Sequence, residues 1–131
     1  MDVRVDLARI IISETSDQQV IVLKERNGER QFPIVIGSYE AYAIDRRLKG
    51  FEHPRPLTHD LMANVIESMH GDLERIVVCD LRQGTFYAQL IIRLDGELIE
   101  VDARPSDAIA LGVAMETPIF VAEHVLREVT S

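Results

Sequence analysis

Two hairpin-turn signals at equivalent points of the two halves of the chain constrain its fold more than any other feature. Asn27-Gly28 and Asp95-Gly96 are dipeptides that tolerate positive φ, which a two-residue β-hairpin turn requires. The two dipeptides are about 68 positions apart, and an offset of about 67 then places Glu40 on Asp107 and Ile44 on Leu111. The sequence therefore predicts an internal duplication, with one unit over about residues 1–70 and another over about residues 71–131.

Apolar patterns around the two turns predict the secondary structure. Expected strands cover residues 3–12, 20–24, 31–36, 73–81, 85–94 and 97–102, and expected helices cover 39–48, 58–70, a segment after Pro105 and 123–129. Thr58 is expected to cap the second helix, and Gly50 and Gly71 are expected to end the first and the second. Because consecutive hairpins pair antiparallel, we expect an α+β fold of two related β-β-β-α-α halves. Its sheet would be mostly antiparallel or mixed, with helices packed on it and one shared core.

The length and composition of the chain bound its organisation. It has 131 residues, of which 47% are hydrophobic, so one domain over residues 1–131 is expected and two ordinary ones are not. No apolar run is long enough to span a bilayer, and the N-terminal residues lack the pattern of an export signal. The single cysteine, Cys79, excludes an internal disulfide. We therefore expect a cytoplasmic protein without a membrane partner.

The charge of the chain is acidic overall and basic in one segment. A formal net charge of −8 opposes the long-range attraction on which non-specific nucleic-acid binders depend. Between positions 46 and 55, only Glu52 opposes a basic cluster that consists of Arg46, Arg47, Lys49, His53 and Arg55. One interpretation is that this cluster forms a surface strip that binds phosphate groups. The other is that Arg46, Arg47 and Lys49 simply stabilise the C-terminal end of a helix through the helix dipole.

Residues 101–111 place four polar side chains at a junction between a strand and a helix. Asp102 and Asp107 are carboxylates of the type that hold Mg²⁺ or Mn²⁺, and Arg104 can present its planar fork to a phosphate. The alternative is helix initiation, in which Ser106 or Asp107 caps free amides and Asp107 favours the helix dipole. Arg104 would then hold a carboxylate within the protein.

A second group of candidates lies in the segment that precedes the second expected helix. Arg55, between Pro54 and Pro56, is suited either to bind phosphate or to hold the loop down. His59 can transfer a proton or ligate a metal, and Asp60 follows it directly. The other interpretation of His59 is a hydrogen-bonding surface group in the first turn of a helix.

Three segments of the chain resemble the bifunctional nuclease family. They are residues 101–111, residues 54–61 and residues 84–88. Residues 33–37, 40–41 and 118–121 fit the same family. The resemblance implies DNase and RNase activity. We therefore expect a nuclease of low sequence specificity that depends on Mg²⁺ or Mn²⁺. The candidate catalytic residues are His59, Asp60 and Asp107, the candidate substrate-binding residues are Arg55, Arg104 and Ser106, and the candidate metal ligands are Asp102, Asp107 and Glu40.

The alternative is a non-catalytic module, in which the motif residues form a buried polar network or a site for a regulatory ligand or a partner. The acidic charge, the scarcity of aromatic residues for stacking on single strands and the ordinary capping roles favour it. In the enzyme interpretation the partner is nucleic acid, bound transiently as substrate. Exposed hairpin edges predict a homo-oligomer in either case.

Overall fold

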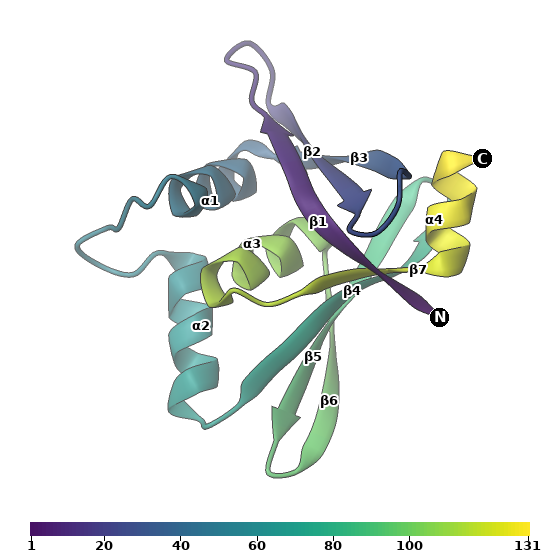
Figure 1. The fold of residues 1–131 in the computed structure, drawn as a ribbon. Coiled ribbons are helices and arrows are strands. Elements are labelled where there is room, and N and C mark those ends of the chain that lie inside the picture. The colour runs from purple at the N-terminus through teal and green to yellow at the C-terminus, as the bar shows by residue number, and fades with distance from the viewer.

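A computed structural model describes residues 1–131 as a mixed sheet of seven strands with four helices (Figure 1). The strands are β1 (Asp2–Ile11), β2 (Gln18–Glu25), β3 (Gln31–Gly37), β4 (Asp72–Arg82), β5 (Thr85–Leu94), β6 (Glu97–Ala103) and β7 (Ile119–Ala122). The helices are α1 (Ser38–Leu48), α2 (Thr58–Ser68), α3 (Pro105–Met115) and α4 (Glu123–Thr130). The expected α+β class is confirmed. None of the four helices is long and apolar enough to cross a membrane.

Two antiparallel meanders form the two sides of the sheet, whose strand order is β3-β2-β1-β7-β4-β5-β6. Strand β7 lies between them and pairs antiparallel with β1 and parallel with β4. The second half therefore runs β-β-β-α-β-α, and the expected β-β-β-α-α order missed one strand. This strand has only four residues, and it forms because it has a pairing partner on each side. The duplication itself stays a prediction, in which the two meanders superimpose.

The two hairpin signals form different turns. Asp95 and Gly96 have φ values of 52° and 80°, as a tight two-residue turn requires. Neither Asn27 nor Gly28 has a positive φ, so the expectation of the same turn there was wrong. The β2–β3 connection is a longer loop, closed by a bond of 2.9 Å from the Glu25 amide to the Arg30 carbonyl. A longer loop closes this hairpin without left-handed residues.

Two of the expected helix boundaries also differ from the structure. Helix α1 ends at Leu48, and the expected stop residue Gly50 follows it with a left-handed φ of 77°. In α2 the left-handed residue is His70, with a φ of 63°, and not Gly71. Thr58 is the first residue of α2 rather than its cap, because the Asp60 carboxylate accepts the Leu57 amide at 3.1 Å and so satisfies the start of the helix.

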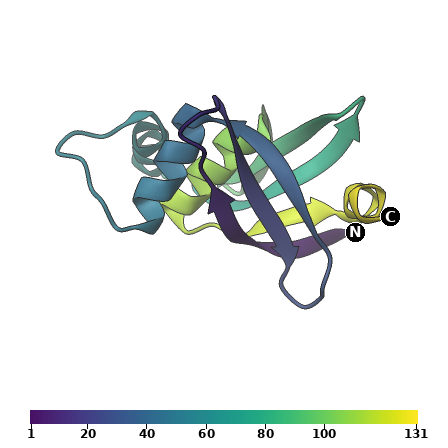
Figure 2. The same ribbon diagram turned by 90° about the horizontal axis from the view of Figure 1, so that it is seen from above.

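Helix α3 lies between two hydrophobic clusters. The larger cluster has 16 buried residues from β1–β4, β7, α1, α3 and α4, and the smaller has seven from α2, α3, β4 and β5. Helices α1, α2 and α3 lie side by side, whereas α4 lies at the other end of the sheet near the N-terminus (Figures 1 and 2). Both clusters include residues of α3, so residues 108–112 are buried on every side of the helix. The same packing places the start of α3 against α1 and α2.

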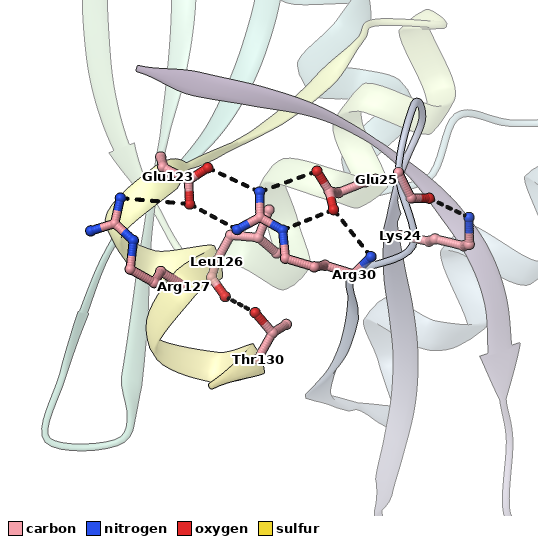
Figure 3. Close-up of polar contacts among 8 residues, drawn as sticks. Lys24, Glu25, Arg30, Glu123, Leu126, Arg127 and Thr130 are labelled. Atoms are coloured by element: carbon pink, nitrogen blue, oxygen red, sulfur yellow. Dashed lines mark hydrogen bonds and ion pairs between the residues drawn. The ribbon is translucent and has the colours of Figure 1, made fainter.

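An arginine ties the β2–β3 loop to α4 (Figure 3). Arg30 donates to the Glu25 carboxylate at 2.8 Å and to both oxygens of Glu123 at 2.9 Å. These hydrogen bonds lower the pKa of Glu25 and of Glu123 below their usual range. The same bonds raise the pKa of Arg30, so the cluster is charged at neutral pH.

Acid should therefore weaken the fold. A carboxyl group with a lowered folded-state pKa stabilises the protein above its unfolded pKa, here about 4.5, and this contribution is lost as the pH falls through the folded pKa. We expect the free energy of unfolding, measured with urea at a series of pH values, to fall below pH 4.5. Arg30→Gln should reduce this slope, whereas Arg9→Gln, at an exposed position without an ion pair, should not. An unchanged slope in Arg30→Gln would contradict the conclusion that Arg30 lowers the pKa of Glu25 and Glu123.

Candidate active site

The starts of α1, α2 and α3 bring four polar side chains together. Glu40 lies in the first turn of α1, His59 in the first turn of α2, and Arg104 and Asp107 at the start of α3. Glu40 and His59 are buried. The start of α3 is therefore the place where residues from three separate segments of the sequence meet.

These side chains form one polar chain, which we call the Asp107 network: Glu40, Arg104, Asp107 and His59. His59 Nε2 lies 3.1 Å from Asp107 Oδ1, and Arg104 Nε donates to Asp107 Oδ2 at 2.9 Å. Arg104 Nη2 lies 2.8 Å from Asp107 Oδ2 and 3.8 Å from Glu40 Oε1. The bond to Asp107 raises the pKa of Arg104. Both carboxylate oxygens of Asp107 therefore have partners, one on each side.

The contact with Asp107 selects one tautomer of the neutral His59 ring. An ionised carboxylate only accepts hydrogen bonds, so His59 Nε2 carries the proton and Nδ1 keeps its lone pair in the neutral ring. No protein group bonds Nδ1, and Nδ1 is not among the enclosed atoms that lack a partner. His59 lines a cleft, and Nδ1 is its one ring nitrogen without a partner in the protein.

The two interpretations of the strand-to-helix junction can now be compared. No side chain caps α3, whose N-cap residue is Arg104 and whose first residue is Pro105. Asp107 instead bonds His59 and Arg104, which supports a role beyond helix initiation. The expected capping by Ser106 or Asp107 is absent. Ser106 is buried and, with Arg104, lines a separate groove of about 530 Å³ next to β3.

The cleft beside His59 has a volume of about 280 Å³ and lies between α1, α2, α3 and the loop that joins α1 to α2. Arg46, Arg47 and His53 of the basic cluster line it, and Lys49 and Arg55 do not. Arg55 is exposed, although both neighbouring prolines line the cleft. Part of the basic cluster therefore faces the same space as His59.

Asp60 also lines the cleft, but its oxygens have partners within the protein. One oxygen accepts the Leu57 amide at 3.1 Å, and the other lies 3.6 Å from Arg47 Nη1. Arg47 Nη2 in turn donates to the Ala114 carbonyl at 2.7 Å. Asp60 and Arg47 thus join the start of α2 to the ends of α1 and α3.

The three expected metal ligands do not come together. Ala103 packs against the smaller cluster, so Asp102, the preceding residue of β6, points to the opposite face of the sheet. Burial, with the nearby charges of Asp80 and Asp102, raises the pKa of Cys79, which agrees with that placement. The chain has no group of three or more His, Cys, Asp or Glu side chains suited to a metal ion. The side chains present therefore do not fit the expected carboxylate metal site.

The sequence reasoning missed the aromatic residues of this region. Tyr39 and Thr58 share a hydrogen bond of 2.9 Å between their hydroxyl groups, which joins α1 to α2 beside His59. Arg46 lies over the rings of Tyr42 and Phe51. Tyr42 and Arg46 are four residues apart on the expected helix, and this spacing was the available signal for their contact.

The motifs around the Asp107 network match a known family. A family model described as the bifunctional nuclease domain matches residues 21–131. The chain belongs to this family. The resemblance that the sequence motifs indicated is therefore confirmed.

Relatives of this bifunctional nuclease domain include both bacterial and plant proteins. An uncharacterized protein of Mycobacterium tuberculosis is 43% identical over 119 residues, which cover 91% of this chain and 71% of that protein. Bifunctional nuclease 2 of Oryza sativa subsp. japonica is 27% identical over 114 residues, or 84% of this chain and 35% of that protein. The bifunctional nuclease of Oryza minuta is 23% identical over 118 residues, or 87% and 36%. The chain thus spans about a third of each rice protein.

Proposed function

We propose that this domain is a nuclease that hydrolyses phosphodiester bonds of DNA and RNA, with His59 as its proton-transfer group. One observation carries the proposal: His59 Nε2 lies 3.1 Å from Asp107 Oδ1, and His59 lines a cleft. Membership of the family, and the nuclease names of the rice relatives, support nucleic acid as the substrate class.

In the proposed reaction, His59 acts as a general base. Nδ1 accepts a proton from a water molecule as the water oxygen attacks phosphorus, the bond from phosphorus to the leaving oxygen breaks, and the leaving oxygen takes a proton from solvent. The imidazolium then releases its proton to solvent, which restores the base. Asp107 holds the ring and stabilises its charged form, as the carboxylate does in a catalytic triad. Arg104 holds Asp107 in place and Glu40 lies 3.8 Å from Arg104, so both are positioning residues.

No divalent ion takes part in the steps proposed above. Mg²⁺ and Mn²⁺ prefer several oxygen ligands, and the expected ligands Asp102, Asp107 and Glu40 do not meet at one point. The cleavage assay therefore has to measure how the rate depends on divalent ions. The rate is to be compared in Mg²⁺, in Mn²⁺ and with chelator.

Asp107→Asn tests the proposal with little change in shape. Losing a charged hydrogen bond costs about 1.5–3 kcal/mol, which corresponds to roughly a 10- to 150-fold lower rate if the bond matters in the transition state. We expect that loss in the cleavage of plasmid DNA and of RNA, with the melting temperature nearly unchanged. Arg127→Gln, at an exposed position of α4 away from the cleft, is the control and should keep the rate.

The enzyme interpretation fails if cleavage does not co-elute with the protein, whereas equal activity in Asp107→Asn and Arg127→Gln would remove Asp107 from the mechanism. The first result would favour the non-catalytic module, with the Asp107 network as a structural link between helices. A cytoplasmic location and a homo-oligomeric state stay predictions, to be checked by cell fractionation and by size-exclusion chromatography with light scattering.

A further inference from the structure

Arg46 occupies an unusual position at the end of α1. Its guanidinium group lies 4.7 Å from the centre of the Tyr42 ring and 4.5 Å from the centre of the Phe51 ring. It has no carboxylate partner among the ion pairs of the chain, in contrast to Arg47 and Lys49 beside it. Its Nε atom is enclosed without any hydrogen-bond partner.

His53 has a similar unsatisfied atom. Its Nε2 is enclosed and has no partner, and its ring centre lies 6.4 Å from that of Tyr42. His53 and Arg46 both line the cleft that His59 lines. The two enclosed atoms face the protein interior, whereas Arg46 Nη1, Arg46 Nη2 and His53 Nδ1 form no hydrogen bond and are not enclosed. Because both residues line the cleft, these open nitrogen atoms are the ones that a bound group can reach.

The charges of the cleft indicate the sign of that group. Asp60, one of the two acidic residues that line the cleft, is already near Arg47 at 3.6 Å. The other acid is Glu52, whose side chain is exposed and forms no ion pair in the structure. Arg46 therefore supplies a positive charge that no carboxylate neutralises, and its ring contacts hold the guanidinium plane in one orientation.

We infer that Arg46 and His53 form a phosphate-binding subsite in the cleft, where a nucleic acid places a phosphate next to the bond that reacts at His59. Arginine presents a planar set of donors that matches phosphate oxygens, and imidazole supplies a further donor. The identity of the ligand as a nucleic-acid phosphate rests on the proposed function. Binding of phosphate itself does not.

The test is a titration of the isotopically labelled full chain with inorganic phosphate, followed by NMR at constant ionic strength. We expect saturable shifts of the Arg46 guanidinium N–H signals and of the His53 ring signals, with chloride at equal ionic strength giving none. In Arg46→Gln the dissociation constant should rise about tenfold, as for loss of one charged hydrogen bond. His53→Gln should weaken binding independently. Lys49→Gln removes a neighbouring exposed charge outside the cleft and should bind as the unmodified chain does.

Two results would overturn the subsite: no saturable shift at Arg46, or equal affinity in Arg46→Gln and the unmodified chain. His59→Asn separates this inference from the proposed function, because an inactive variant should still bind phosphate. Phosphate binding without nuclease activity would refute the proposed function alone. Activity that depends on His59, with unchanged phosphate affinity in Arg46→Gln, would refute the subsite alone.

A 5′-phosphorylated tetranucleotide should compete with inorganic phosphate and shift the same Arg46 and His53 signals. Failure to compete would overturn the assignment of the ligand as a nucleic-acid phosphate.

Discussion

Replacement of His59 by Asn should lower the rate of nucleic-acid cleavage by about 10²- to 10⁴-fold, the usual contribution of a positioned proton-transfer group. Asn has no group that accepts a proton from water at neutral pH, so the first step of the proposed reaction loses its base. The measurement is single-turnover cleavage of a labelled oligonucleotide, of DNA and of RNA. Circular dichroism and thermal unfolding check that the variant is folded.

The matched control is His70→Asn, at the other end of the same helix. His70 is exposed and left-handed, with a φ of 63°, and Asn tolerates that conformation. This variant should cleave as fast as the unmodified domain. Comparable rates in His59→Asn and His70→Asn would remove His59 from the mechanism and leave the Asp107 network with a structural role.

Truncation of Ile109 to Ala should produce the largest loss of stability among the substitutions considered, about 2–5 kcal/mol in the free energy of unfolding. Ile109 has no exposed surface and belongs to the larger cluster, two positions after Asp107 in α3. The lost methyl groups leave a cavity that the surrounding strands can fill only in part. Urea unfolding followed by circular dichroism measures the change.

Two milder variants bracket this expectation. Ile109→Val removes one methylene-sized group and should cost about 0.5–1.5 kcal/mol. Val65→Ala lies on the exposed face of α2, where Val65 is 47% exposed, and should change stability by less than about 0.5 kcal/mol. A loss in Ile109→Ala no greater than in Val65→Ala would mean that α3 is not packed between the two clusters.

Local patterns predicted most of the secondary structure. The six longer strands and the helices appear close to their expected positions, because apolar periodicity and turn residues act over a few neighbouring residues. Strand β7 and the form of the β2–β3 loop were not predictable in this way. β7 is stabilised by β1 and β4, which are distant in sequence, and the β2–β3 loop contains the partner of Glu123, 93 residues away from Arg30 along the chain.

The sequence by itself determined the residue types of the candidate site and one of its contacts. Arg104 and Asp107 are three residues apart at the start of a helix, so their ion pair follows from local geometry. The contact between His59 and Asp107 spans 48 residues and exists only because α2 and α3 pack together over the smaller cluster. The tertiary structure also separated Asp102 from Asp107, since successive residues of a strand point to opposite faces and only one face of β6 is turned toward α3. Short-range sterics and hydrogen bonding act on neighbours in sequence, whereas the burial of apolar surface decides which distant segments meet.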